Sequence, residues 1–208
     1  MPNTRRRRIV ELIHVFTACL MLAPMTAAQT DTVKIPDEVK AFIEKGMVPI
    51  ALETGDLNAD GRKDFILVSS AVVPENASYE EGAGERSVLL LVRDAGGDLN
   101  LVARNDLVVL CRNCGGVFGD PYAGVTVRGT RFTVSNYGGS NSRWSYEYTF
   151  AWSRRDRTWQ LVRVEDSSFH ALDPRHTTRT HIYTPPKDFG LINFADFDPD
   201  NFKGKGKK

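Results

Sequence analysis

Residues 143–153, RWSYEYTFAWS, place an aromatic ring at every second position. In an extended strand, side chains two residues apart project from the same face, so this stretch is predicted to be a strand with one aromatic face. Five exposed rings would form a large apolar patch, which favours burial of that face in the core. The alternative is a platform on which sugar rings stack. The rings belong to Trp144, Tyr146, Tyr148, Phe150 and Trp152.

Short β-type runs recur on both sides of this strand and are separated by turn-forming residues. Glycine in such turns supplies the positive φ that tight hairpins need. We therefore expect a mainly β fold, a single domain of antiparallel hairpins arranged as a meander. The other predicted strands are 48–52, 65–70, 88–94, 99–104, 107–110, 124–128, 132–137, 158–165 and 180–183, with hairpin turns at 95–98, 129–130 and 154–157.

Residues 36–46, PDEVKAFIEKG, predict one short N-terminal helix. Val39, Phe42 and Ile43 recur at helical spacing, with acids in the first turn and glycine at the end. Residues 74–86 are acidic and lack periodicity, which indicates a mobile surface loop. No unit of 20–50 residues repeats along the chain, so a complete propeller is not expected.

The first 28 residues have the order of a secretory signal peptide. Four arginines precede an apolar run over 15–25 and small residues over 26–28. That run is too short for a hydrocarbon layer of about 30 Å, so we expect removal and no transmembrane segment afterwards. The expected organisation is a signal peptide at 1–28, a mostly β domain at 29–195 and a flexible charged tail at 196–208.

We expect a periplasmic or secreted protein. Residues 16–19, FTAC, resemble a lipoprotein cleavage box, but the apolar residues after Cys19 favour a continuing signal segment. The arginine run also resembles a twin-arginine signal, which leaves the export route open. The chain carries 27 basic and 26 acidic residues. Because four of the arginines lie in the leader, the mature part is slightly acidic, and no nucleic-acid partner is expected.

Residues 56–64, DLNADGRKD, place oxygen-bearing side chains at loop positions 1, 3, 5 and 9 and glycine at position 6. Ca²⁺ takes six to eight oxygen ligands, and this spacing can direct several oxygens at one point. Position 12 is Leu67 where an EF-hand carries glutamate, which disfavours an EF-hand. The alternative is a polar β-turn without metal. The expected Ca²⁺ ligands are Asp56, Asn58, Asp60, Asp64 and the Arg62 main-chain carbonyl.

Residues 55–68, GDLNADGRKDFILV, resemble the calcium loops of FG-GAP repeats, the units of integrin-α-like propellers. The resemblance implies a calcium ion between two adjoining strands, bound by the residues named above. Dockerin loops are similar but continue into helices. Residues 101–163 are also similar to a group of exported bacterial proteins that carry runs like VLCRNCGGVFGDPY and NYGGSNSRWSYEYTF. That second resemblance implies no activity.

Cys111 and Cys114 are the cysteines left after the leader. An oxidising compartment favours a disulfide between them, worth roughly 2 kcal/mol in so small a ring. A redox C-x-x-C is the alternative, but such motifs open a helix, and glycines follow here. Zinc would need further ligands at suitable spacing. His170, His176 and His181 are expected to be surface histidines rather than metal ligands.

Residues 136–143, NYGGSNSR, combine a flexible backbone with polar donors next to the aromatic strand. They predict a recognition loop or, alternatively, a wide hairpin turn. We expect an exported, calcium-stabilised β module that binds a carbohydrate or an envelope protein. The alternative is a hydrolase of cell-wall or extracellular polymer, although no recognisable catalytic motif is present. The candidate ligand-binding residues are Tyr137, Asn141, Arg143, Trp144 and Tyr146.

Overall fold

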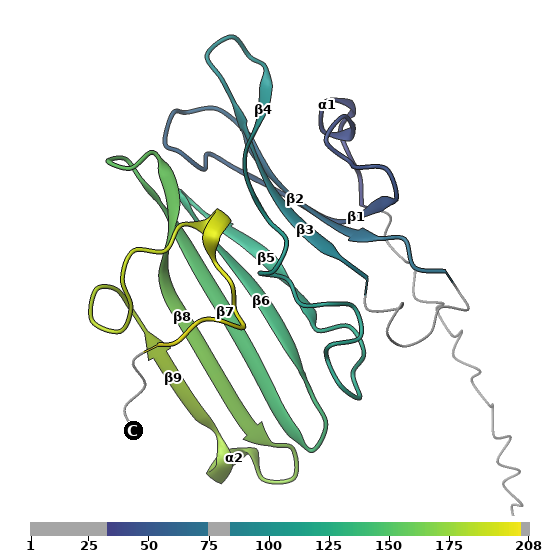
Figure 1. Cartoon of the computed structure of the whole chain (residues 1–208), viewed down its shortest axis with the longest axis vertical. Helices are drawn as coiled ribbons and strands as arrows, with labels where there is room; N and C mark the ends of the chain where they lie inside the picture. Colours follow the sequence, from purple (N-terminus) through teal and green to yellow (C-terminus); the bar gives the residue numbers. More distant parts are fainter. Residues whose placement is uncertain (1–32, 75–83, 205–208) are drawn as a thin grey trace, which may run out of the picture. The chain divides into compact units, whose positions relative to one another are not determined.

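The computed structural model describes residues 33–74 and 84–204. The predicted signal peptide and residues 75–83 of the predicted mobile loop lie outside this range. Within it, nine strands form two antiparallel sheets (Figure 1), in the orders β1-β2-β3-β4 and β5-β6-β7-β8-β9. The predicted meander of hairpins in a mainly β fold is confirmed, and the described strands form neither a closed barrel nor a propeller.

Within each sheet, strands that are adjacent in the sequence are also paired, so both sheets are built from consecutive hairpins. The first sheet contains β1 (Met47–Gly55), β2 (Asp64–Ala71), β3 (Arg86–Arg93) and β4 (Leu99–Asn105). The second sheet contains β5 (Tyr122–Arg128), β6 (Arg131–Gly139), β7 (Ser142–Ser153), β8 (Thr158–His170) and β9 (Arg179–Tyr183). The described helices are α1 (Asp37–Lys40), α2 (Pro174–Thr177) and the 3-10 helix η2 (Phe194–Asp196).

Strand β2 is buried on both faces, so it reads as a continuous apolar run. Ile66 and Val68 belong to the main core, which also contains the inner residues of the second sheet. Phe65 and Leu67 point the other way, into a smaller cluster with Val39 of α1. The first sheet is therefore a middle layer between α1 and the second sheet.

The aromatic face of β7 is largely core, as its alternation indicates. Tyr148 and Phe150 are buried, and Tyr146 and Trp152 pack against the same cluster. The Phe150 ring lies 5.2 Å from that of Phe132 on β6, centroid to centroid. Trp144 and Tyr146, toward Ser142, are half-buried, as is Trp152 at the other end of the strand.

The predicted helix over 36–46 is shorter than expected. Helix α1 ends at Lys40, and the amides of Phe42 and Ile43 donate to carbonyls three residues back instead of four.

The predicted strand over 107–110 is wrong. The side-chain oxygen of Asn105 accepts hydrogen bonds from the amides of Leu107 and Val108, at 2.8 and 2.7 Å, and this local pairing replaces a strand ladder.

Part of the predicted flexible tail, the C-terminal segment of residues 196–204, packs on the domain through apolar side chains. Phe197 is 1% exposed and lies in the main core. The ring of Phe202 packs edge-on against Tyr183 and Phe189, at 5.7 and 5.4 Å between centroids. Two aromatic residues therefore hold a polar segment across the second sheet, where its end is drawn in yellow in Figure 1. Residues 205–208 lie outside the described range.

Asn105 joins this segment to the first sheet. Its amide nitrogen donates to the carbonyls of Phe194 and Phe197, at 2.6 and 2.7 Å, while its oxygen accepts the two amides described above. The side chain is buried, 4% exposed, and satisfies four backbone groups at once. Replacing such a side chain is costly, because the backbone groups bonded to it lose their hydrogen bonds at a place that water does not reach.

We predict that Asn105→Ala lowers the free energy of unfolding by at least about 2 kcal/mol, because buried backbone groups lose their partners. The matched control is Asn100→Ala on the same strand. Asn100 is exposed, and its side chain donates to Asp94 and Asp98 of the adjacent turn, so its replacement should cost about 0.5 kcal/mol or less. Urea unfolding of both variants measures the difference, and equal losses would contradict the bracing role of Asn105.

Candidate functional site

The polar loop 56–64 connects β1 to β2 and is closed by its own side chains. Both carboxylate oxygens of Asp56 accept backbone amides, from Asp60 at 3.0 Å and Gly61 at 2.9 Å. Ala59 and Gly61 adopt φ values of 62° and 82°, in the left-handed region. Polar side chains that capture nearby amides stabilise such turns. The loop therefore has a defined conformation.

Asp64 is the buried member of this loop. It is 0% exposed and accepts amides from Leu57 at 2.9 Å and Arg93 at 3.0 Å. Burial raises the pKa of Asp64, and the charges of Asp60 and Asp56 raise it further, although the two hydrogen bonds act against the rise. No ion pair reaches this carboxylate within the described part of the chain. Asp64 is therefore a desolvated acid whose charge is balanced only by more distant cations such as the Arg93 guanidinium.

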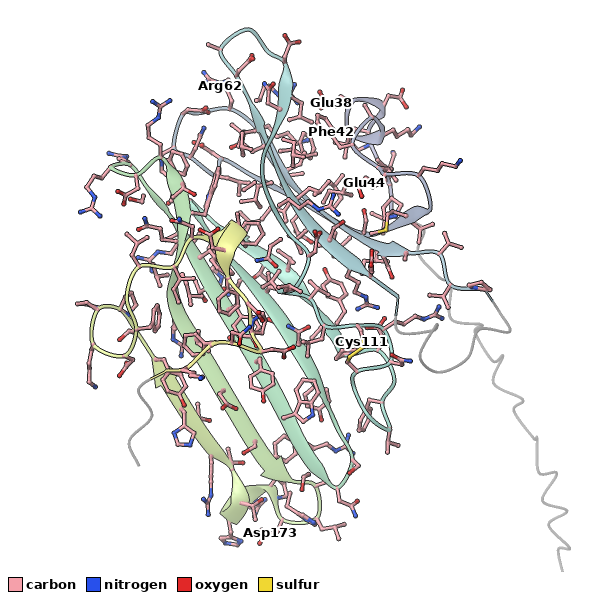
Figure 2. The ribbon with its side chains drawn as sticks, in the orientation of Figure 1. Glu38, Phe42, Glu44, Arg62, Cys111 and Asp173 are labelled. Atoms are coloured by element: carbon pink, nitrogen blue, oxygen red, sulfur yellow. A yellow bond between two sulfur atoms is a disulfide. The ribbon has the colours of Figure 1, made fainter. Side chains whose placement is uncertain are left out.

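Asp60 has a cation of its own. The Arg62 guanidinium, labelled in Figure 2, lies 2.8 Å from the Asp60 carboxylate and also donates to the Arg93 carbonyl at 3.0 Å. Burial opposes ionisation, but hydrogen bonds from Asn58 and Arg62 and the Arg62 charge lower the pKa of Asp60 overall. An arginine side chain therefore supplies positive charge at the exposed side of the loop.

The donor set of the loop fits a hard cation, because it offers three carboxylates, among them the buried Asp64, and an amide oxygen. Within residues 33–74 and 84–204, however, no three His, Cys, Asp or Glu side chains converge closely enough to hold a metal. The Asp56, Asp60 and Asp64 carboxylates are each engaged in the hydrogen bonds described above. A bound ion would therefore compete with Arg62 for Asp60.

A second feature is a groove of about 420 Å³ between the second sheet and the C-terminal segment. Its volume lies within the usual range of small-molecule sites. Tyr146 and Tyr148 stack with ring centroids 6.2 Å apart and planes 7° apart. The lining residues are Leu110, Tyr146, Tyr148, Val164, Asp166, Tyr183, Pro199, Asp200, Phe202, Lys203 and Gly204.

The groove combines aromatic walls with charged groups. Burial raises the pKa of Tyr146 and Tyr148, and the charge of Asp166 raises both further, so the two phenols are neutral at physiological pH. Asp200 and Lys203 are exposed at the C-terminal side, whereas Asp166 is partly buried on β8. A ligand in the groove would meet flat rings and several hydrogen-bonding groups.

The pleat of the sheet separates the five candidate ligand-binding residues. Tyr146 lines the groove, and Trp144 lies next to it on the same face, with ring centroids 5.3 Å apart. Tyr137 and Arg143 project from the opposite face, because side chains alternate along β6 and β7. Asn141 lies in the turn, where its carbonyl accepts the amide of Ala171 at 2.7 Å.

Sequence reasoning missed most of the groove residues. Asp166, Tyr183, Asp200 and Lys203 come from β8, β9 and the C-terminal segment, and nothing in their spacing brings them together. One signal was present at Asp166. It follows Val164 at a spacing of two, so a carboxylate occupies an inward position of a core strand.

A disulfide joins Cys111 and Cys114, whose Cα atoms are 5.1 Å apart, as the sequence predicts. The glycines that follow lie against the end of the β6–β7 hairpin. Gly139 N donates to the Gly115 carbonyl at 2.9 Å, and Val117 N donates to the Gly139 carbonyl at 3.1 Å. Figure 2 shows Cys111 in this loop beside the second sheet.

Comparison with known proteins gives no match: no protein-family model fits the chain, and no curated protein or solved structure is significantly similar to it. Within the described part of the chain, none of the helices has the length and apolar character needed to cross a bilayer.

We predict that Gly138→Ala displaces Trp144. An added Cβ would lie 2.5 Å from Trp144 Cζ2 and 2.8 Å from the Gly115 carbonyl oxygen. Such overpacking costs about 1–3 kcal/mol. Gly190→Ala is the control, since nothing lies within 4 Å of its added Cβ. Near-UV circular dichroism and urea unfolding should change for Gly138→Ala alone, and an unchanged tryptophan signal would contradict this contact.

Proposed function

We propose that this chain is an exported β module that binds a carbohydrate in the groove between the second sheet and the C-terminal segment. The single observation that carries the proposal is the half-buried Tyr146, stacked on the buried Tyr148, at the wall of a groove that also holds charged groups. Flat rings pack on the apolar faces of pyranoses, and carboxylates accept hydrogen bonds from sugar hydroxyls.

The placement of the charges supports this chemistry. Asp166 is partly buried beside the neutral Tyr146 phenol, which gives an acceptor next to a donor. Lys203 adds a cation at the edge of the groove contributed by the C-terminal segment. Sugars need such mixed donors and acceptors along an aromatic surface, whereas an apolar ligand would leave these groups unpaired.

A second candidate function is hydrolysis of a polysaccharide. It is favoured by one observation, namely that the carboxylates of Asp166 and Asp200 line the same groove. Glycosidases use a pair of carboxylates, one as acid and the other as base or nucleophile. The two candidates predict different outcomes with an oligosaccharide, which is either bound unchanged or cleaved.

We predict that Tyr146→Ala weakens carbohydrate binding at least about tenfold, a loss of about 1.4 kcal/mol, because it removes one wall of the groove. The matched control is Tyr137→Ala on the opposite face of the sheet, which should bind as the unchanged chain does. A glycan array of cell-wall and extracellular polysaccharides identifies the probe, and calorimetry measures the affinities.

A reducing-sugar assay with the same probe separates the two functions. Product release that is abolished by Asp166→Asn or Asp200→Asn would establish the hydrolase. Binding without product supports the binding module. No bound glycan, or equal affinity for the Tyr146→Ala and Tyr137→Ala variants, would exclude the groove as a carbohydrate site.

We further propose that loop 56–64 binds Ca²⁺ as a structural ion, as its likeness to FG-GAP loops implies. The ligands would be the side chains and the Arg62 carbonyl predicted from the sequence. Support comes from Asp64, a buried carboxylate that forms no direct ion pair with the described residues. The loop also touches the second sheet, because Trp159 Nε1 donates to the Leu57 carbonyl at 3.0 Å. A calcium ion here would stabilise the junction of the two sheets.

We predict that Ca²⁺ at 100 times its dissociation constant stabilises the chain by about 2.7 kcal/mol relative to chelator, seen as a higher melting temperature. Asp56→Ala should abolish the shift, whereas Asp98→Ala, at an exposed acid in another turn, should leave it unchanged. Arg62→Gln keeps the main-chain ligand and removes the competing guanidinium, so its calcium affinity should rise. A melting temperature that is equal in calcium and in chelator would refute the metal site.

A further inference from the structure

The Phe118 ring contacts Tyr137 and Arg143 on the opposite side of the second sheet from the groove, and the exposed Val117 precedes Phe118 in the chain. We call Val117, Phe118, Tyr137 and Arg143 the outer patch. Val117 is 82% exposed and Phe118 is 47% exposed, which is unusual for large apolar side chains. The rings of Phe118 and Tyr137 lie 5.9 Å apart. Exposed aromatic residues beside an arginine are typical of the energetic centre of a protein interface.

Arg143 is the polar centre of the outer patch. Its guanidinium carbon lies 3.8 Å from the centre of the Phe118 ring, so one face of the guanidinium is covered. Its Nε is buried and has no hydrogen-bond partner, and its guanidinium forms no ion pair with the described residues. A carboxylate of a partner could pair with the two Nη groups of this guanidinium through two parallel hydrogen bonds.

The backbone that carries Val117 and Phe118 is already ordered. The Cys111–Cys114 disulfide closes one end of its loop, and the hydrogen bonds to Gly139 fix its centre. At the other end, Asp120 accepts two hydrogen bonds from the buried Arg86 of β3, at 2.8 and 2.5 Å. A surface that is ordered before binding loses less entropy when a partner docks.

We propose that the outer patch binds an acidic peptide segment of a partner protein. An Asp or Glu carboxylate of the segment pairs with Arg143, and an adjacent apolar side chain covers Val117 and Phe118. A sugar fits this surface poorly, because Arg143 already occupies one face of the Phe118 ring and Val117 offers only aliphatic surface. The site is independent of the groove, which lies on the other face of the sheet.

The test begins with a phage-displayed library of random linear peptides selected on the full chain. The expected peptides carry Asp or Glu next to an apolar residue. A synthetic peptide from the selection should bind at least tenfold more weakly to Arg143→Gln and to Phe118→Ala, and Arg143→Lys should recover only part of the loss. Tyr146→Ala is the control on the other face and should bind as the unchanged chain does.

The peptide itself supplies a test that does not depend on the variants folding. Replacing its acidic residue by the corresponding amide should weaken binding to the unchanged chain by the same factor as Arg143→Gln does. The two changes made together should cost no more than either alone, because they remove one interaction. A selection without peptides, selected peptides without acidic residues, or full affinity of Arg143→Gln would overturn the proposal.

Discussion

The two-residue period of β7 is the constraint on which the rest of this structure depends. Its aromatic side chains share one face, and Tyr148 and Phe150 on that face are buried between the sheets. Burying them requires the first sheet and the C-terminal segment to cover the second sheet. These elements leave the Ser142 end of the aromatic face partly uncovered. The same row of aromatic side chains therefore lines the core in the middle of β7 and the groove at Tyr146. Core and candidate binding site are two parts of one strand face.

The groove exists because a polar segment is held down by a few apolar side chains. Phe197 enters the main core, and Phe202 packs against Tyr183 of the edge strand β9. Asn105 adds two hydrogen bonds to the carbonyls of this segment from the first sheet. Asp200 lies between Phe197 and Phe202 in the chain, and Lys203 directly follows Phe202. The stability of the C-terminal segment and the shape of the groove are therefore coupled.

Opposite faces of one hairpin carry different chemistry. Tyr146 faces the groove, whereas Arg143 and Tyr137 face outward beside Phe118. This separation follows from the alternation of side chains in a strand, and it allows each proposed site to be altered without touching the other. The Asp-rich loop is a third, separate feature. It lies at the start of β2 and reaches the second sheet through Trp159 and the Leu57 carbonyl.

The sequence by itself determined most of the strands, their hairpins and the disulfide, because period, turn glycines and cysteine spacing act over a few residues. Alternation also predicted that the rings of β7 share a face. Only the tertiary structure decided what covers that face, since the partners of Phe197 and Asn105 lie far away in the chain. Alternation within one strand predicted Tyr146 as a candidate ligand-binding residue. Asp166 and Asp200 were not predicted, because they reach the groove through contacts between distant segments. Contacts between distant segments have no local period, so a single sequence carries no pattern from which to predict them.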